Sequence, residues 1–243
     1  MLVNAQYPIK TGSVNGLIPA DMRFPDVLMK CDAVNVLQLI LNKISAENSI
    51  VPVSAYRSLK EQTDIYNASL KDNGKDFTKK YVALPNHSEH QTGLAIDLAL
   101  NKNEIDFIRP NFPYEGICNE FRKVASDYGF IERYAKGKEK ITGISHESWH
   151  FRYVGYPHSK IMDENALSLE EYMEFIKYYR EDCRFLYRQT LEAETRTEAE
   201  IEIYYIPSNG DITQIAMSDN CLYQISGNNM EGFIATVWRK NDD

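Results

Sequence analysis

Residues 146–150 read HESWH, which matches the H-E-x-x-H pattern of proteases that bind zinc on a helix. On a helix, side chains four residues apart share a face, so both imidazoles reach one ion. The overlapping segment WHFRYV instead alternates aromatic with other residues, and Gly143 and Gly155 flank it, which is typical of a strand. On a strand, His146 and His150 would lie roughly 13 Å apart. The sequence therefore predicts that these two histidines do not share a metal.

A metal site can still form around His150 if other segments supply ligands. A catalytic zinc ion needs about three protein nitrogen or oxygen ligands and one open position for water. The segment TGLAIDLAL, residues 92–100, alternates between an aliphatic face and a face of small residues that carries Asp97. His87 and His90 precede this strand, and either could be the third ligand by spacing alone. His90 is favoured because it lies nearer the strand.

Helices and strands predicted around these residues would position them. Apolar spacing predicts a helix over residues 32–46, and a short strand follows over residues 49–55. Ser58 and Glu61 form a capping box that opens a helix ending near Gly74. Arg57 therefore lies at a strand-to-helix corner, from which its side chain can project into a site. A further helix is predicted over residues 117–130.

The C-terminal third of the chain has a different pattern. A second capping box at Ser168 predicts the longest helix, over residues 167–189, followed by an acidic connector. Four short strands with turn signals between them then follow, at residues 201–206, 211–217, 221–226 and 231–238. We therefore expect one domain of residues 1–182, which holds the candidate metal ligands, and a small β-rich appendage of residues 198–243 whose role the sequence does not indicate.

The overall composition limits the class of protein. The 243 residues carry a formal net charge of −8, which argues against nucleic acid as a partner. No apolar run approaches the roughly 18 residues of a membrane span. The absence of a recognisable signal peptide favours a cytoplasmic location, with the cell envelope as the alternative if an N-terminal anchor was removed. The four cysteines include no C-x-x-C pair, so no thiolate zinc site is indicated.

Three segments resemble the motifs of the VanX/VanY-type zinc D-alanyl-D-alanine peptidases. They are SEHQTGLAID at residues 88–97, ESWH at residues 147–150, and SAYRS at residues 54–58 followed by Gln62, with Ala55 where the family usually has glycine. The longer stretches SLKDNGKDFTKKYVALPNHSEHQTGLAIDLAL and KEKITGISHESWHFRYVGYPHS are especially similar to the bifunctional VanXY-type D,D-dipeptidase/D,D-carboxypeptidases. The resemblance runs from about residue 2 to about residue 179 and leaves out the β-rich appendage.

The resemblance implies an α+β fold of the hedgehog/D-Ala-D-Ala peptidase-like type, with the small C-terminal β appendage added. It also implies one zinc ion per chain, bound by His90, Asp97 and His150. Glu147 would be the general base. His146 has no ligand role in the family, so only part of the HESWH match would be functional.

The resemblance also implies which residues meet the substrate. Arg57 would bind the substrate and polarise its scissile carbonyl, because its guanidinium is permanently charged. Ser88 and Gln62 would line the substrate pocket. Arg152 shares a strand face with His150, and we interpret it as a residue that orients groups around the metal.

These expectations describe a zinc metallopeptidase that acts on peptidoglycan precursors ending in D-Ala-D-Ala or on the free D-Ala-D-Ala dipeptide. Either activity would deplete the target of vancomycin, which links the protein to glycopeptide resistance or wall remodelling. One alternative is an L,D-carboxypeptidase that trims tetrapeptide stems. A less favoured alternative is a non-catalytic wall-binding module whose zinc is only structural.

Overall fold

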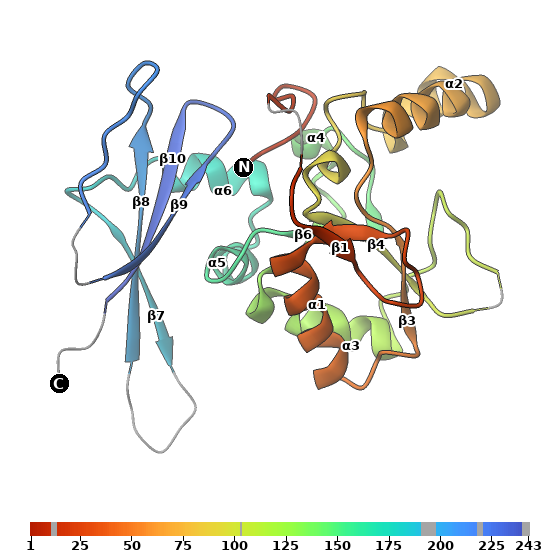
Figure 1. Cartoon of the computed structure of the whole chain (residues 1–243), viewed down its shortest axis with the longest axis horizontal. Coiled ribbons are helices and arrows are strands. Elements are labelled where there is room, and N and C mark those ends of the chain that lie inside the picture. The colour runs from red at the N-terminus through yellow and green to blue at the C-terminus, as the bar shows by residue number, and fades with distance from the viewer. Residues whose placement is uncertain (11–13, 103, 191–197, 218–220, 240–243) are drawn as a thin grey trace. The chain divides into compact units, whose positions relative to one another are not determined.

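In a computed structural model of the chain, residues 1–10, 14–102, 104–190, 198–217 and 221–239 are described. The chain divides into two compact units, one of residues Val3–Ser168 and one of Met1–Leu2 with Leu169–Asp243 (Figure 1). Each unit combines helices with an antiparallel sheet, so the predicted α+β class is confirmed. The division into a catalytic domain of residues 1–182 and an appendage of residues 198–243 stays a prediction.

A four-stranded antiparallel sheet organises the first unit. Its strands are β3 (Ile50–Ser54), β4 (Ala95–Leu100), β6 (Glu147–Tyr153) and β5 (Phe130–Tyr134), in that order across the sheet. The strands predicted around residues 49–55, 92–100 and 149–154 are therefore confirmed. Because β4 and β6 are neighbours, side chains from these two strands meet on each face of the sheet.

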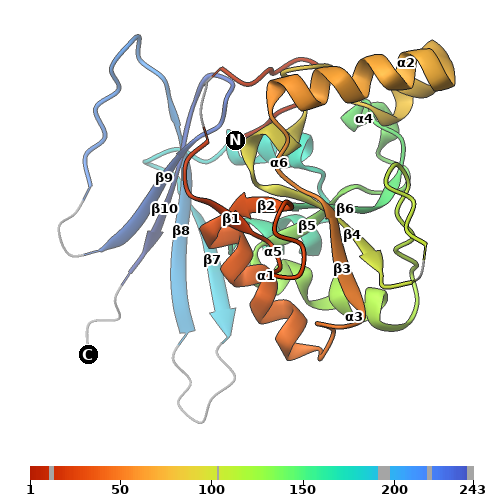
Figure 2. The same cartoon turned by 45° about the vertical axis from the view of Figure 1, so that its right-hand side comes forward.

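One face of this sheet packs into the main hydrophobic core. Ile96 and Leu98 of β4 and Phe151 of β6 join buried residues of α1 (Cys31–Lys43) and α3 (Gly116–Ala125) in this core. Both helices were predicted, the first from its apolar spacing, although α3 ends at Ala125 and not at residue 130. They lie on the same side of the sheet in Figures 1 and 2. The opposite face of β4 is left for its small residues and Asp97, as the alternation predicted.

The long helix α2 (Leu59–Tyr81) lies on the other side of the sheet from α1 (Figures 1 and 2). It begins at the predicted capping box, in which the Ser58 hydroxyl accepts from the Glu61 amide and the Glu61 carboxylate accepts from the Ser58 amide. Gly74 has a non-helical backbone (φ 80°, ψ 172°) and interrupts the helix near the predicted end. No helix among the described residues is long and apolar enough to cross a membrane.

The described residues of the first unit also form six shorter elements. They are β1 (Leu17–Pro19), β2 (Leu28–Lys30), the 3₁₀ turns η1 (Glu89–Thr92) and η2 (Ser126–Tyr128), and the helices α4 (Glu139–Thr142) and α5 (His158–Glu164). β1 and β2 pair as a small antiparallel ribbon. The turn η1 leads directly into β4 and carries the candidate ligand His90.

The second unit contains α6 (Leu169–Ile176) and a second antiparallel sheet. The strands of that sheet are β7 (Phe185–Thr190), β8 (Glu198–Pro207), β10 (Gly232–Trp238) and β9 (Leu222–Gly227), in that order. Three of the four predicted C-terminal strands are confirmed as β8, β9 and β10.

The predicted helix over residues 167–189 is wrong in its second half. α6 ends at Ile176, and the chain turns back to form β7 at the edge of the second sheet. The Tyr179 carbonyl accepts a hydrogen bond of 2.8 Å from the Tyr205 amide. The rings of Tyr179 and Phe185 pack edge to face with centroids 5.0 Å apart. The aromatic residues that suggested a helix therefore pack across a turn instead. Strand pairing supplies the backbone hydrogen bonds that a helix would otherwise have made.

The predicted strand over residues 211–217 is also wrong. Residues 212–217 have no regular structure, and Ile212 is 79% exposed. Met217 instead packs near Tyr204, whose hydroxyl donates to the Met217 sulfur. The fourth strand of this sheet is β7 instead.

Gly93, which ends η1 just before β4, allows a test of how tightly this turn is packed. Its backbone is left-handed (φ 69°), and a Cβ placed there would lie 2.8 Å from Cδ2 of Leu17. We expect Gly93→Ala to lower the free energy of unfolding by roughly 1–2 kcal/mol for the left-handed backbone. Crowding against the end of the Leu17 side chain would add up to about 1 kcal/mol.

Gly143→Ala is the matched control for this substitution. Gly143 also ends a helical turn in a left-handed conformation (φ 75°), but a Cβ there would meet nothing within 4 Å. Denaturant unfolding of both variants measures the two losses. Equal losses would contradict the close packing of Gly93 against the β1–β2 ribbon.

Candidate metal centre

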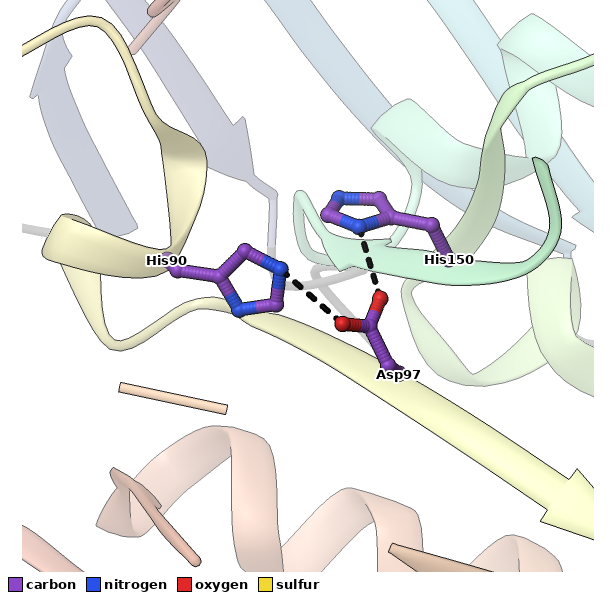
Figure 3. A group of neighbouring side chains, drawn as sticks. All are labelled: His90, Asp97 and His150. Atoms are coloured by element: carbon purple, nitrogen blue, oxygen red, sulfur yellow. Dashed lines mark hydrogen bonds and ion pairs between the residues drawn. The ribbon is translucent and has the colours of Figure 1, made fainter. Parts of the chain in front are cut away.

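Three buried side chains from three different elements converge at the face of β4 that carries the small residues. His90 comes from η1, Asp97 from β4 and His150 from β6, and each offers a ligand atom within 4.8 Å of the others. Asp97 and His150 are direct partners in the β4–β6 ladder, which brings their side chains together. Figure 3 shows both imidazoles directed at the Asp97 carboxylate. The three predicted ligands therefore form one group that could hold a metal ion.

The hydrogen bonds of His90 leave one ring nitrogen for a metal. Its Nδ1 lies 2.6 Å from the carbonyl oxygen of Ala55, to which only a protonated nitrogen can donate. Its Nε2 lies 3.3 Å from Oδ2 of Asp97. Burial and the nearby Arg57 guanidinium lower the pKa of His90 to about 4, against the opposing effect of Asp97. His90 is therefore a neutral imidazole with its Nε2 lone pair facing the carboxylate.

Asp97 is the central charge of the group. Burial alone would raise its pKa, but His90 and His150 outweigh burial and hold the pKa well below the usual range. Oδ1 of Asp97 lies 2.9 Å from Nδ1 of His150. Burial disfavours the charged form of His150, yet Asp97 and Glu89 raise its pKa to about 9. A metal cation bound to Nδ1 would replace the proton that Nδ1 carries in the hydrogen bond to Asp97.

Glu147 lies beside the three candidate ligands because β6 is irregular at its start. On a regular strand, residues three apart point to opposite faces, which would separate Glu147 from His150. The β5–β6 pairing shifts register between Glu132 and Tyr134, and Oε2 of Glu147 lies 3.9 Å from Nδ1 of His150. Burial, reinforced by Asp97, raises the pKa of Glu147 to about 8. The site thus contains a carboxyl group that can exchange a proton near neutral pH.

Arg57 projects from the corner between β3 and α2, as predicted. Its guanidinium donates to Oδ2 of Asp97 at 3.0 Å and to the Ser54 hydroxyl at 2.9 Å. The register of β3 against β4 shifts between Pro52 and Ser54, where this corner begins. The Arg57 side chain is 18% exposed, and it places a permanent positive charge beside the buried Asp97.

All seven residues predicted for the site line one cavity of about 420 Å³. They are Arg57, Gln62, Ser88, His90, Asp97, Glu147 and His150. Ser88 and Gln62 are both buried in its wall. The amide nitrogen of Gln62 donates to the Ala83 carbonyl at 2.8 Å, whereas its amide oxygen has no partner among the described residues. That oxygen could accept a hydrogen bond from a molecule in the cavity.

His146 and His87 are engaged elsewhere. His146 precedes β6, and its Nε2 lies 2.6 Å from the Tyr114 hydroxyl and 3.5 Å from Oε1 of Glu132. Nδ1 of His87 lies 2.7 Å from the carbonyl oxygen of Asn4. The prediction that His146 does not share a metal with His150 agrees with this geometry, and so does the preference for His90 over His87.

A buried charged cluster behind His150 was not predicted. The Glu89 carboxylate pairs with Nε of Arg133 at 2.8 Å and with a terminal nitrogen of Arg152 at 2.9 Å. The two arginines outweigh burial and hold the pKa of Glu89 well below its usual range. Arg152 was expected to orient groups near the metal. No role was predicted for Glu89, although it lies between Ser88 and His90 in the sequence. A buried arginine on the His150 face could have indicated the need for such a counter-charge.

Comparison with known proteins places the chain in a family. The model of the VanY D-alanyl-D-alanine carboxypeptidase family matches residues 27–156. The bifunctional D-Ala-D-Ala dipeptidase and D-Ala-D-Ala carboxypeptidase VanXYC of Enterococcus gallinarum is 40% identical over 177 residues, which cover 72% of this chain and 93% of that protein.

Solved structures agree with this result. The vancomycin resistance D,D-dipeptidase VanXYg, in complex with a D-Ala-D-Ala phosphinate analog, matches with a TM-score of 0.94 and 68% identity over 98% of this chain and 93% of its own. The likeness therefore includes the C-terminal sheet, which the sequence motifs had left out.

Two more distant structures are also similar. The LD-carboxypeptidase LdcB matches with a TM-score of 0.61 and 32% identity, over 71% of this chain and 84% of its own. A mutant of the vancomycin resistance D,D-pentapeptidase VanY, in complex with Zn(II), matches with a TM-score of 0.57 and 29% identity, over 71% and 97%. The chain thus belongs to the VanY family of D-alanyl-D-alanine carboxypeptidases.

Proposed function

We propose that this chain is a zinc metallopeptidase that removes the terminal D-Ala from peptidoglycan precursors ending in D-Ala-D-Ala and also splits the free dipeptide. One observation carries the proposal: the buried group of His90, Asp97 and His150 shares a cavity with Glu147 and Arg57. The bifunctional relative and the D,D-dipeptidase structure with a D-Ala-D-Ala analog support both activities.

The three candidate ligands fit zinc. Zinc in catalytic sites binds imidazole nitrogens and carboxylate oxygens at roughly 2.0–2.2 Å, so tetrahedral ligands lie roughly 3.3–3.5 Å from one another. Oδ2 of Asp97 lies 3.3 Å from Nε2 of His90, within this range, and Oδ1 of Asp97 lies 2.9 Å from Nδ1 of His150, slightly below it. We propose one zinc ion per chain at this group. When bound, it would supply a Lewis acid that polarises a carbonyl and lowers the pKa of a water molecule.

Glu147 is the proposed general base. Its raised pKa lets it take a proton from the attacking water and return that proton to the leaving amine near neutral pH. Its position depends on the irregular start of β6, which directs the carboxylate toward His150. In this role Glu147 moves a proton and holds no metal.

Arg57 is the proposed substrate clamp. Its guanidinium faces the cavity beside Asp97 and can bind a carboxylate or offset negative charge that develops on the scissile carbonyl oxygen. Ser88 and Gln62 are proposed to line the peptide pocket, and the unpartnered oxygen of Gln62 can accept an N–H of the peptide. Backbone peptide groups supply such donors at every residue.

The biological setting follows from the activity. Loss of D-Ala-D-Ala termini depletes the target of vancomycin, so we propose a role in glycopeptide resistance or wall remodelling. A cytoplasmic location and the lack of a nucleic-acid partner stay predictions from the sequence. The L,D-carboxypeptidase alternative has structural neighbours in its favour, at 32% and 33% identity. The D,D assignment is preferred because the D,D-dipeptidase neighbour is 68% identical.

The metal content of three variants tests the ligand assignment. We expect His90→Ala and Asp97→Ala to lose the zinc ion, because each removes a ligand of the buried group. His146→Ala is the matched control and keeps about one zinc per chain, since His146 contacts Tyr114 and Glu132 instead. Elemental analysis after gel filtration measures the content. Zinc loss in His146→Ala together with retention in His90→Ala would restore the helical H-E-x-x-H interpretation.

Glu147→Gln tests the general base. We expect kcat for D-Ala-D-Ala hydrolysis to fall by about 10²–10⁴-fold while zinc content is unchanged, because the amide cannot accept the water's proton. Glu115→Gln, a change at an exposed glutamate outside the cavity, leaves kcat unchanged. A chelator abolishes turnover in the unmodified enzyme, and added zinc restores it. Normal turnover by zinc-free protein would rule out the proposed mechanism.

Product analysis distinguishes a D,D-carboxypeptidase from an L,D-carboxypeptidase. We expect mass spectrometry to show D-Ala release from a muramyl pentapeptide and from free D-Ala-D-Ala, with the tetrapeptide left intact. Release of D-Ala from the tetrapeptide without cleavage of the other two substrates would establish the L,D-carboxypeptidase.

A further inference from the structure

Glu89 is a fully buried carboxylate whose two oxygens face different partners. Oε1 pairs with Nε of Arg133 at 2.8 Å and with Nη1 of Arg152 at 2.9 Å. Oε2 lies 3.7 Å from Nε2 of His150, on the side of that ring away from Asp97. The arginines thus hold the carboxylate from one side, and His150 meets its other side.

The atoms that face each other here have no other hydrogen-bond partner among the described residues. Oε2 of Glu89 and Nε2 of His150 are both buried, and neither has a hydrogen-bond partner among the described residues. A buried polar atom without a hydrogen-bond partner destabilises the fold, so each of these two atoms is the expected partner of the other. The 3.7 Å separation exceeds a hydrogen bond by less than about 1 Å, which a small rotation of the imidazole can close.

The geometry points to Glu89 as the positioning residue for His150: it accepts the Nε2–H of the imidazole and so presents Nδ1 to the metal. This inference rests on the proposed function, because it needs a metal ion at Nδ1. A neutral imidazole has one ring nitrogen without a proton, and only that nitrogen can bind a metal. The hydrogen bond that the protonated nitrogen donates therefore decides which nitrogen binds the metal. Arg133 and Arg152 keep the Glu89 carboxylate from turning away.

The alternative is that Glu89 merely neutralises two buried arginines and stabilises the fold. The second unit offers a matched group for this possibility. Glu202 is also a buried carboxylate between two arginines, with Arg184 and Arg239 each at 2.6 Å. The side chains of Arg184 and Arg239 are 29% and 60% exposed, so only the carboxylate of this group is buried. Glu202 belongs to β8 of the other sheet, so its loss reports the effect of removing a buried carboxylate from two arginines without touching the metal group.

The test compares the zinc dissociation constants of the full chain and of Glu89→Gln and Glu202→Gln, measured by competition with a chromophoric chelator. We expect Glu89→Gln to weaken zinc binding by about 10–100-fold and Glu202→Gln to leave it unchanged. The absorption spectrum of the Co(II)-substituted protein should change only in Glu89→Gln. Unchanged zinc affinity and an unchanged Co(II) spectrum in folded Glu89→Gln would overturn the inference.

Nitrogen NMR of the unmodified zinc-loaded protein decides the matter independently of any variant, and therefore also if Glu89→Gln does not fold. We expect His150 to be protonated at Nε2 and His90 at Nδ1. A proton on Nδ1 of His150 would overturn the positioning role of Glu89. Failure of the unmodified chain to bind zinc at all would instead count against the proposed function.

Discussion

The buried carboxylate of Asp97 is the group on which the rest of the site depends. It contacts two imidazoles and one guanidinium at 2.9–3.3 Å. An isolated carboxylate buried in this way would cost several kcal/mol, so the fold must bring compensating groups to it from η1, β6 and the β3–α2 corner. The same convergence produces a set of ligand atoms close enough for one metal ion.

The sheet makes this convergence possible by using its two faces differently. Ile96 and Leu98 fix β4 in the hydrophobic core, which sets its register and so places Asp97 opposite His150. Irregular pairing on the neighbouring ladders then redirects the side chains that a regular sheet would send elsewhere. Arg57 and Glu147 both lie next to such irregularities, and both reach the cavity that the ligands line.

The sequence predicted the parts of this arrangement that follow from local periodicity. The alternation of residues 92–100 identified the face of Asp97, and the aromatic alternation after His146 identified β6 and excluded a helical metal motif. The roles of Glu147, Arg57, Ser88 and Gln62 came from a resemblance, not from physical reasoning on the residues. Register shifts depend on pairing between distant strands, so no local pattern could show why Glu147 meets His150.

The errors of prediction have the same origin. Residues 177–189 have helix-like aromatic spacing, but their partners lie in β8, which is encountered only later in the chain. The sequence did not indicate a role for Glu89, because its two arginines are 44 and 63 positions away. Long-range pairing of charges and strands therefore limits what the sequence alone could predict here.

Anomalous diffraction at the zinc absorption edge, from crystals of the zinc-loaded chain, locates the metal directly. We expect a single peak per chain, bounded by Nε2 of His90, a carboxylate oxygen of Asp97 and Nδ1 of His150. A peak located elsewhere, or one ligated by His146, would contradict this expectation.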